Sequence, residues 1–227
     1  YFADNSFLTD KEEKSQNEVK KLEINFGNVQ VIAIPSFHGK LAVINNAGKR
    51  GFKVCYNCGY TVLGNAKNIP HPHSTQWGKE CQGKLYSNLA LGHEFTTDIL
   101  RLSFSGYNNP DEGFWFSLLY ALLEGASTVL DIERQDIDGC LYYADMSPQL
   151  IFFDDVPGGA GHVHRMAQRQ RLLDILKVSL QRLKRCECGG NEDQASCYGC
   201  LRNYRNQFCH DKLDRHVVID FLEDLLK

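Results

Sequence analysis

The 227-residue sequence lacks several features that mark whole classes of protein. No apolar run approaches the roughly 18 residues that a transmembrane helix needs, so we expect no membrane partner. The first twenty residues are polar and charged, so we expect no secretory signal peptide there. The net charge is −3, which excludes a polycation that binds nucleic acid over its whole surface. Because the chain begins at Tyr1 rather than methionine, we expect a piece of a larger protein.

Cysteine, by contrast, is abundant, with nine in the chain. Six of them form close pairs, whose members can bind one metal ion but can bridge each other only with strain. The odd number and the expected absence of a signal peptide both argue against a disulfide framework. We therefore expect a reducing, cytoplasmic location and cysteines that bind metal as thiolates.

The strongest motif is a group of four cysteines within fifteen residues, Cys186, Cys188, Cys197 and Cys200. Four thiolates suit a tetrahedral zinc ion, and four protein ligands leave no open position for catalysis. The alternative is four buried or free thiols. Outside this group, Cys140 is expected in the core, and Cys209 is either packed or a spare ligand.

A second metal site is predicted around Cys55 and Cys58, whose spacing and following glycine are typical of a zinc knuckle. Cys81 is a candidate third ligand, and His73 (or His71) a candidate fourth. His73 is preferred because it lies closer in sequence to Cys81. A redox-active pair is the alternative, but such a pair normally opens a helix, and no helical pattern follows here. The sequence thus predicts Zn²⁺ as the cofactor, at one site or at two.

Hydrophobic periodicity predicts an α+β fold with a mixed sheet and packed helices. Hydrophobic residues make up 43% of the chain and aromatic residues 11%, which is enough for a packed core. The strands are expected in a hairpin over 22–34 and at 41–45, 85–104, 140–143 and 149–153. The helices are expected at 113–130, from the glycine-rich loop 157–161 to about 185, and at 214–226.

The expected organisation is one zinc-binding domain over 22–227, preceded by a linker or frayed N-terminus at 1–21. Residues 51–83 are rich in Gly, Cys, His and Pro and have little apolar periodicity, so we expect a zinc-ribbon-like insert there. Residues 184–210 are expected to form the four-cysteine zinc segment. The strand–glycine-loop–helix order at 149–185 suggests that part of the sheet is α/β-like, while the hairpins suggest an antiparallel part.

Several of these motifs together resemble a known family. The stretch IFFDDVPGGAGHV, a basic helix, C-x-C, SCYGCLRNYRNQ and H-x-x-LDR follow one another from Ile151 to Leu222. This order resembles the zinc-binding C-terminal domain of MrfA-like superfamily-two DNA helicases and the helicase-associated subunit of DISARM phage defence. FKVCYNCG and LGHEFTTDILRL resemble earlier parts of the same family more distantly. The resemblance assigns zinc binding to the four C-terminal cysteines.

The resemblance implies an accessory domain that accompanies an ATP-driven motor in DNA repair or antiviral defence. The chain contains no G-x-x-x-x-G-K-[ST] phosphate loop, so we expect the motor elsewhere, in the same parent chain or in a partner. The fragment itself is expected to be no enzyme. DNA and a helicase motor, in cis or in trans, are its expected partners.

Nucleic-acid contact is predicted for the basic segment 163–215, which has eleven Lys and Arg residues against six Asp and Glu residues. The candidates are Arg165, Arg169, Arg202, Tyr204 and Arg205. The alternative is that Arg202 and Arg205 pair with Asp211 and Asp214 to hold the last helix. The loop 157–161 could bind a backbone phosphate or be a tight turn, and the second interpretation is favoured.

Two other functions are consistent with the same residues. The overall acidity favours a protein-interaction scaffold that has structural zinc and no DNA contact. A metal-dependent nuclease would use Asp154, Asp155, His162 and His164, because neighbouring carboxylates and histidines can bind a catalytic cation. Turn chemistry explains those four positions equally well, so we place this function last.

Overall fold

A computed structural model describes residues 4–10, 21–144, 147–191 and 193–227. The chain forms two compact units. Unit 1 is built mainly from Ala42–Glu94, and unit 2 from Ser6–Leu41 and Phe95–Lys227. The sequence predicts one domain over 22–227, whereas the contacts divide this range in two. The predicted zinc-ribbon-like insert lies wholly within unit 1.

Unit 2 contains a six-stranded sheet with the order β1-β3-β9-β11-β10, in which β2 also pairs with β3. Its strands are β1 (Asp4–Asp10), β2 (Leu22–Phe26), β3 (Val29–Asn45), β9 (Leu91–Ser105), β10 (Ile137–Ala144) and β11 (Ser147–Asp154). The ranges of β3 and β9 extend into unit 1. The predicted hairpin over 22–34 is present as β2 and β3, which are joined by a turn at Gly27 and Asn28.

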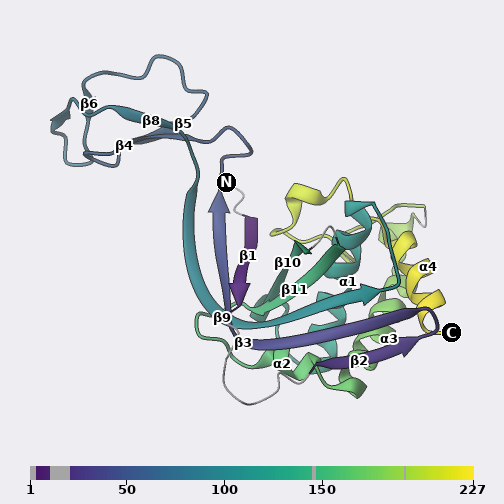
Figure 1. Cartoon of the computed structure of the whole chain (residues 1–227). Coiled ribbons are helices and arrows are strands. Elements are labelled where there is room, and N and C mark those ends of the chain that lie inside the picture. Colours follow the sequence, from purple (N-terminus) through teal and green to yellow (C-terminus); the bar gives the residue numbers. More distant parts are fainter. Residues whose placement is uncertain (1–3, 11–20, 145–146, 192) are drawn as a thin grey trace. The chain divides into compact units, whose positions relative to one another are not determined.

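The α+β prediction is confirmed. Four helices lie on one face of the sheet (Figure 1). They are α1 (Glu112–Leu130), α2 (His162–Met166), α3 (Arg169–Arg185) and α4 (Arg215–Leu225). The predicted α/β-like part is not found, because β11 runs antiparallel to both of its neighbours, β9 and β10.

Helix α1 is the centre of the core, as its uniformly apolar sequence predicts. Asp111 caps its start by accepting hydrogen bonds from the backbone N–H groups of Gly113 and Phe114. A side chain at Gly125 would collide with α3, because a Cβ there would lie 2.1 Å from Ser179 Oγ. Ser179 in turn donates a hydrogen bond to the carbonyl of Ala121. Gly125 therefore lets α1 and α3 cross at close range.

The expectation that no apolar run approaches the length of a transmembrane helix is wrong for α1, which by length and composition alone is apolar enough to cross a membrane. In the folded chain, 72% of its most apolar window is buried against the sheet and the other helices. Burial of this kind explains its apolar character as that of a core helix.

Strand β11 is covered on both faces, as its continuous apolar run predicts. Leu150 and Phe152 join the large core under the helices. Ile151 and Phe153 point to the opposite face, where they pack with Leu41 of the long strand β3. All four of these β11 side chains are fully buried.

Unit 1 has little core of its own. Its strands β4 (Phe52–Cys55), β5 (Thr61–Leu63) and β8 (Leu85–Leu89) form an antiparallel sheet of order β5-β4-β8. A second hairpin pairs β6 (His73–Ser74) with β7 (Glu80–Cys81). Phe52, at 5% exposure, is the one large apolar side chain that is buried in the range 42–94. A unit with so small a core needs another source of stability.

Two further predictions differ from the structure. The predicted linker 1–21 lies mostly outside the described residues, but strand β1 falls within it. The strand pattern of this segment is weak in the sequence, and its pairing with β3 in the sheet accounts for the strand. The predicted single helix after the glycine-rich loop is divided at Gln168, whose backbone is extended. The break lets Val163 of α2 and Leu172 of α3 both reach the core.

Candidate metal centres

The four C-terminal cysteines come together at the end of α3. Cys186 is the residue at which α3 ends, and Cys188 follows in a short 3₁₀ turn. Cys197 and Cys200 occupy the two ends of a second turn. The four sulfur atoms lie within 4.8 Å of one another, and a single metal ion could bind all four.

The sulfur–sulfur distances match a tetrahedral zinc site. Cys186 Sγ lies 3.5 Å from Cys197 Sγ and 3.8 Å from Cys188 Sγ. Cys200 Sγ lies 3.9 Å from Cys188 Sγ and 3.8 Å from Cys197 Sγ. A zinc ion with bonds of about 2.3 Å to four sulfurs requires an edge of about 3.8 Å between them. The four side chains are therefore already spaced as zinc ligands.

Backbone N–H groups also favour thiolates here. Gly199 N–H donates to Cys197 Sγ, and Cys197 N–H donates to Cys200 Sγ. Burial acts in the opposite direction and raises the pKa of Cys188 to about 11 and that of Cys200 further still. At Cys197 burial likewise raises the pKa, but the hydrogen bond from Gly199 N–H and the side-chain contacts with the other three cysteines together outweigh it, so the net shift is downward. Four thiolates this close together, two of them buried, need a cation to remain charged, and zinc supplies one.

A second metal-binding group forms in unit 1 from Cys55, Cys58, His73 and Cys81, whose ligand atoms also lie within 4.8 Å of one another. Cys55 Sγ lies 3.8 Å from Cys81 Sγ, and Cys58 Sγ lies 3.2 Å from His73 Nε2. The structure thus brings in the preferred histidine, His73, and not His71. Gly83 N–H donates to Cys81 Sγ. Burial raises the pKa of Cys55, but hydrogen bonds from the backbone N–H groups of Cys58 and Asn57 and contacts with the Cys58 and His73 side chains together lower it to about 6.

The fold of unit 1 explains how residues so far apart in sequence meet. Cys55 ends β4, Cys58 lies in the tight turn that follows, and His73 and Cys81 pair across the β6–β7 hairpin. The His73 ring is 1% exposed and stacks on Tyr60 at 4.7 Å. Its Nδ1 has no hydrogen-bond partner among the described residues, while Nε2 points to Cys58. The ring is therefore oriented for ligation by stacking and by the hairpin.

Comparison with known proteins agrees with this geometry, because a family model described as "MrfA Zn-binding domain" covers residues 118–201 and hence all four C-terminal cysteines. Residues 118–201 match the MrfA Zn-binding domain. The chain is also 25% identical over 233 residues to Druantia protein DruE of Escherichia coli (strain UMEA 4076-1). That alignment covers 88% of this chain and 12% of DruE.

Among solved structures, the crystal structure of DUF1998 helicase MrfA bound to DNA matches with a TM-score of 0.50 and 14% identity. The match covers 98% of this chain and 24% of the MrfA chain. At this identity the likeness establishes a shared fold. A second MrfA structure, bound to DNA and AMPPNP, matches with a TM-score of 0.43.

One residue beyond the MrfA Zn-binding match connects the cysteine loop (residues 186–214) to the helices on either side of it, α3 and α4. Arg215, at the start of α4, is 5% exposed. Its Nη1 donates to the carbonyl oxygens of Leu183 and Cys186 at 3.2 and 2.6 Å, and its Nε donates to Gln194 at 3.4 Å. The charged side chain thus caps the carbonyl end of α3, where the helix dipole favours a cation.

The predicted nucleic-acid residues fall on two parts of unit 2. Arg165 donates to the carbonyl of Leu130, at the end of α1, and the exposed Arg169 donates to the carbonyl of Glu23. Arg202 donates to Ser196 Oγ. The predicted pairing with Asp211 and Asp214 is absent from the contacts of the described residues. Tyr204 is 81% exposed, and its ring lies 5.8 Å from that of Tyr198.

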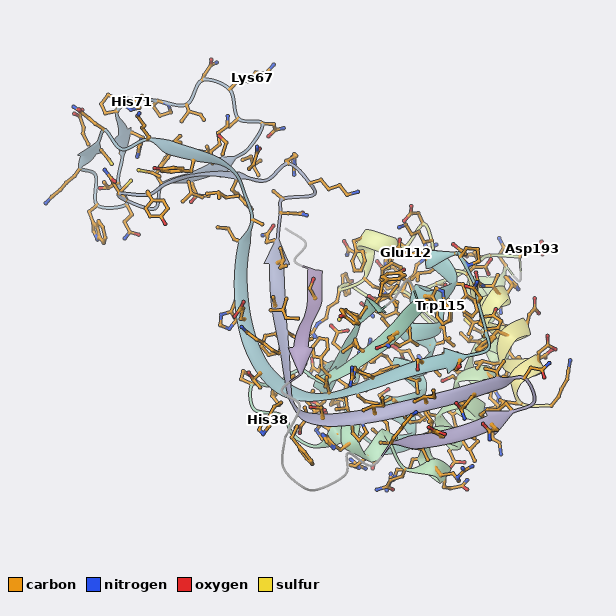
Figure 2. The ribbon with its side chains drawn as sticks, viewed as in Figure 1. His38, Lys67, His71, Glu112, Trp115 and Asp193 are labelled. Carbon is orange, nitrogen blue, oxygen red and sulfur yellow. The ribbon has the colours of Figure 1, made fainter. Side chains whose placement is uncertain are left out.

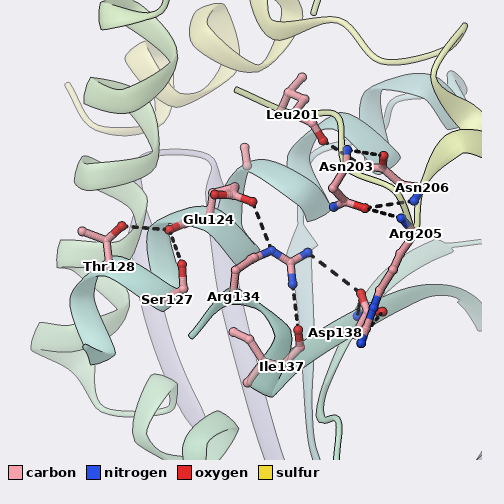
Figure 3. A network of polar contacts seen from close by, with 12 residues as sticks. Glu124, Ser127, Thr128, Arg134, Ile137, Asp138, Leu201, Asn203, Arg205 and Asn206 are labelled. Atoms are coloured by element: carbon pink, nitrogen blue, oxygen red, sulfur yellow. Dashed lines mark hydrogen bonds and ion pairs between the residues drawn. The ribbon is translucent and has the colours of Figure 1, made fainter. Parts of the chain in front are cut away.

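The guanidinium group of Arg205 interacts with two carboxylates. It forms an ion pair with Asp155 and lies 3.5 Å from Asp138 Oδ2. Asp138 is buried at the start of β10, and burial raises its pKa, whereas Arg134 and Arg205 lower it. Figure 3 shows Asp138 between these two guanidinium groups. This network connects the loop after the four cysteines to the sheet. No sequence motif predicts it.

The glycine-rich loop is a tight turn whose N–H groups are already bound. The buried carboxylate of Asp154 accepts hydrogen bonds from the N–H groups of Ala160 and Val163 at 2.6 and 3.0 Å, and from His162. Gly161 N–H donates to Asp98. A Cβ at Gly159 would lie 2.3 Å from the Asp98 side chain, so glycine is required there. The carboxylates of Asp154 and Asp98 therefore already accept the N–H hydrogen bonds that a bound phosphate would need.

We expect Asp154→Ala to destabilise the protein by about 3 kcal/mol, because three N–H groups lose their shared acceptor. Urea denaturation of the zinc-loaded chain measures the effect. The exposed Asp224 provides the control, since Asp224→Ala should change stability by less than about 0.5 kcal/mol. An Asp154→Ala variant as stable as the parent would contradict this role for the carboxylate.

Proposed function

We propose that this chain is a zinc-dependent accessory domain of a DNA helicase or of a helicase-containing repair or antiviral defence complex. In this role it is cytoplasmic, binds two zinc ions through the residues described above, and contacts DNA or orders the ATP-driven motor. The observation that carries the proposal is the four-sulfur tetrahedron inside the range of the MrfA Zn-binding match. The motor lies in another part of the parent chain or in a partner. The chain spans 12% of DruE and 24% of MrfA, which leaves room for such a motor in those proteins.

The chemistry of the site supports a structural and not a catalytic zinc. Four protein ligands at the C-terminal group leave no position for an activated water. The nuclease alternative loses support because Asp154 is saturated by loop N–H groups. Asp154, Asp155, His162 and His164 also form no metal-binding group among the residues that the structure describes.

DNA contact in unit 2 is assigned to Arg165, Arg169, Arg202, Tyr204 and Arg205. A hydrogen bond to a carbonyl leaves an arginine charged, so Arg165 and Arg169 can still attract phosphates. Arg205 is the weakest member of this set, because two carboxylates neutralise it. Tyr204 is the most exposed member and can stack on an unpaired base.

We expect Tyr204→Ala to weaken DNA binding about tenfold without loss of zinc, because one stacking platform is removed. A mobility-shift assay over a salt series, on the zinc-loaded chain, measures it. Lys227→Ala is the control, since it removes an exposed cation that already pairs with Asp224. Unchanged affinity in Tyr204→Ala would remove this residue from the DNA surface. Absence of salt-dependent binding by the parent chain would favour the alternative, a protein-interaction scaffold, which the paired state of Arg205 also favours.

A further inference from the structure

We propose that unit 1 carries a second surface, one that binds single-stranded nucleic acid through exposed aromatic rings and lysines. Its central residues are Tyr56, Trp77, Tyr86, Lys79 and Lys84. These residues lie outside the basic segment 163–215 and outside the MrfA Zn-binding match. The inference therefore goes beyond the proposed function and does not need the DNA contacts assigned to unit 2.

The first observation is charge. Residues 42–94 contain six Lys and Arg residues against two glutamates, a net of +4 in a chain whose total is −3. The six cations are Lys49, Arg50, Lys53, Lys67, Lys79 and Lys84. None of them forms an ion pair with a residue that the structure describes, and all but Lys53 are exposed. Figure 2 shows Lys67 extending from its loop. This is the electrostatic footprint of a polyanion site.

The second observation is the exposure of three large aromatic rings in the same unit. Tyr56 is 83% exposed, Trp77 76% and Tyr86 54%. The Tyr56 and Tyr86 rings meet edge to face, with their centroids 5.3 Å apart. The unit buries Phe52 but leaves these three rings in solvent. Large apolar surface that stays exposed in so small a unit indicates a binding role.

The third observation is that the rings lie on turns and strands of the unit and that two lysines lie close to them in sequence. Tyr56 lies between the zinc-ligand candidates Cys55 and Cys58, and Tyr86 lies opposite Val54 in the β4–β8 pair. Trp77 lies in the β6–β7 turn, where Gly78 N–H donates to the carbonyl of Thr75. Lys79 is two residues from Trp77, and Lys84 is two residues from Tyr86. Aromatic rings alternating with lysines match the alternation of bases and phosphates along a strand.

These features favour a single strand over the other polyanions. Ring stacking needs an unstacked base face, which a duplex hides and an acidic peptide lacks. Neither a base-specific pocket nor a groove is needed, so we expect little sequence preference. DNA and RNA strands share the required chemistry, and the experiment distinguishes them.

The test uses the zinc-loaded 227-residue chain with labelled oligo-dT, oligo-U and a duplex of equal length, followed by fluorescence anisotropy. We expect both single strands to bind more tightly than the duplex. If about four phosphates are neutralised, the logarithmic salt slope is about −3, which is roughly a 60-fold loss of affinity between 50 and 200 mM salt. Tyr86→Ala and Trp77→Ala should each weaken binding about tenfold with zinc content unchanged.

A direct readout comes from tryptophan fluorescence. The chain has two tryptophans, Trp115 at 2% exposure and Trp77 at 76%. Oligo-dT should quench the emission of the exposed tryptophan, and Trp77→Phe should abolish that response. Equal affinity for the duplex, unquenched Trp77, or binding undiminished in both unit 1 variants would overturn the inference. If Tyr204→Ala alone lowers affinity, the unit 1 surface fails while the DNA contact of unit 2 stands.

Discussion

Replacement of Cys197 by serine is expected to remove one zinc ion per chain and to unfold the C-terminal part of unit 2. Cys197 Sγ lies 3.5 Å from Cys186 Sγ and 3.8 Å from Cys200 Sγ, so its loss opens the tetrahedron. Structural zinc contributes about 10–16 kcal/mol in small zinc-dependent folds, which is as large as the whole stability of a typical domain. The loop also connects α3 to α4, so both helices lose a fixed end.

Zinc content and far-UV circular dichroism of purified Cys197→Ser measure this effect. Cys209→Ser is the matched control, because Cys209 is fully buried but lies outside the four-sulfur group. It should keep the full zinc content, with a loss of stability confined to its core site. Tyr198→Ser, at an exposed position of the same turn, should change neither quantity. A Cys197→Ser variant that retains its zinc and its helices would contradict the metal assignment.

Arg215→Met is expected to destabilise unit 2 by about 3 kcal/mol. The substitution keeps an unbranched side chain but leaves the carbonyls of Leu183 and Cys186 without their charged donor. Hydrogen bonds to charged groups contribute about 1.5–3 kcal/mol each, and buried partners left unpaired add a desolvation penalty. The loss should fall mainly on the junction of α3, the cysteine loop and α4.

Urea denaturation of zinc-loaded Arg215→Met measures the change. Arg185→Met is the matched control, because Arg185 is an exposed arginine at the end of α3. It should stay within about 0.5 kcal/mol of the parent. Equal stability of the two variants would mean that Arg215 does not hold the loop.

The sequence predicts local features of this molecule well. A buried strand such as Leu150–Phe153 and a core helix such as α1 are recognisable because periodicity and apolar content act over a few residues. The pairing of Cys186 and Cys188 with Cys197 and Cys200 follows from short spacing. His73 could be preferred over His71 only from its position relative to Cys81. The β6–β7 hairpin, which brings His73 and Cys81 together, supplies the physical reason.

Features that depend on distant residues could not be predicted. Arg205 contacts Asp138 and Asp155, which are 67 and 50 positions away, so no local pattern indicates its partners. The antiparallel setting of β11 also depends on strand order, which one sequence does not encode locally. The glycine-rich loop has the composition of an anion site, but the carboxylate of Asp154 already binds its N–H groups.

The central claim is that metal binding, and not apolar burial alone, fixes both cysteine-rich parts of the chain. The argument is clearest for unit 1, where Phe52 is the one large buried apolar side chain in the range 42–94 and apolar burial alone is too small to hold the fold. The most direct measurement is the zinc content of the purified chain by elemental analysis, together with that of Cys55→Ser and Cys197→Ser. We predict two zinc ions per parent chain and one in each variant. A parent chain that folds with no bound zinc, or variants that both retain two ions, would contradict the account.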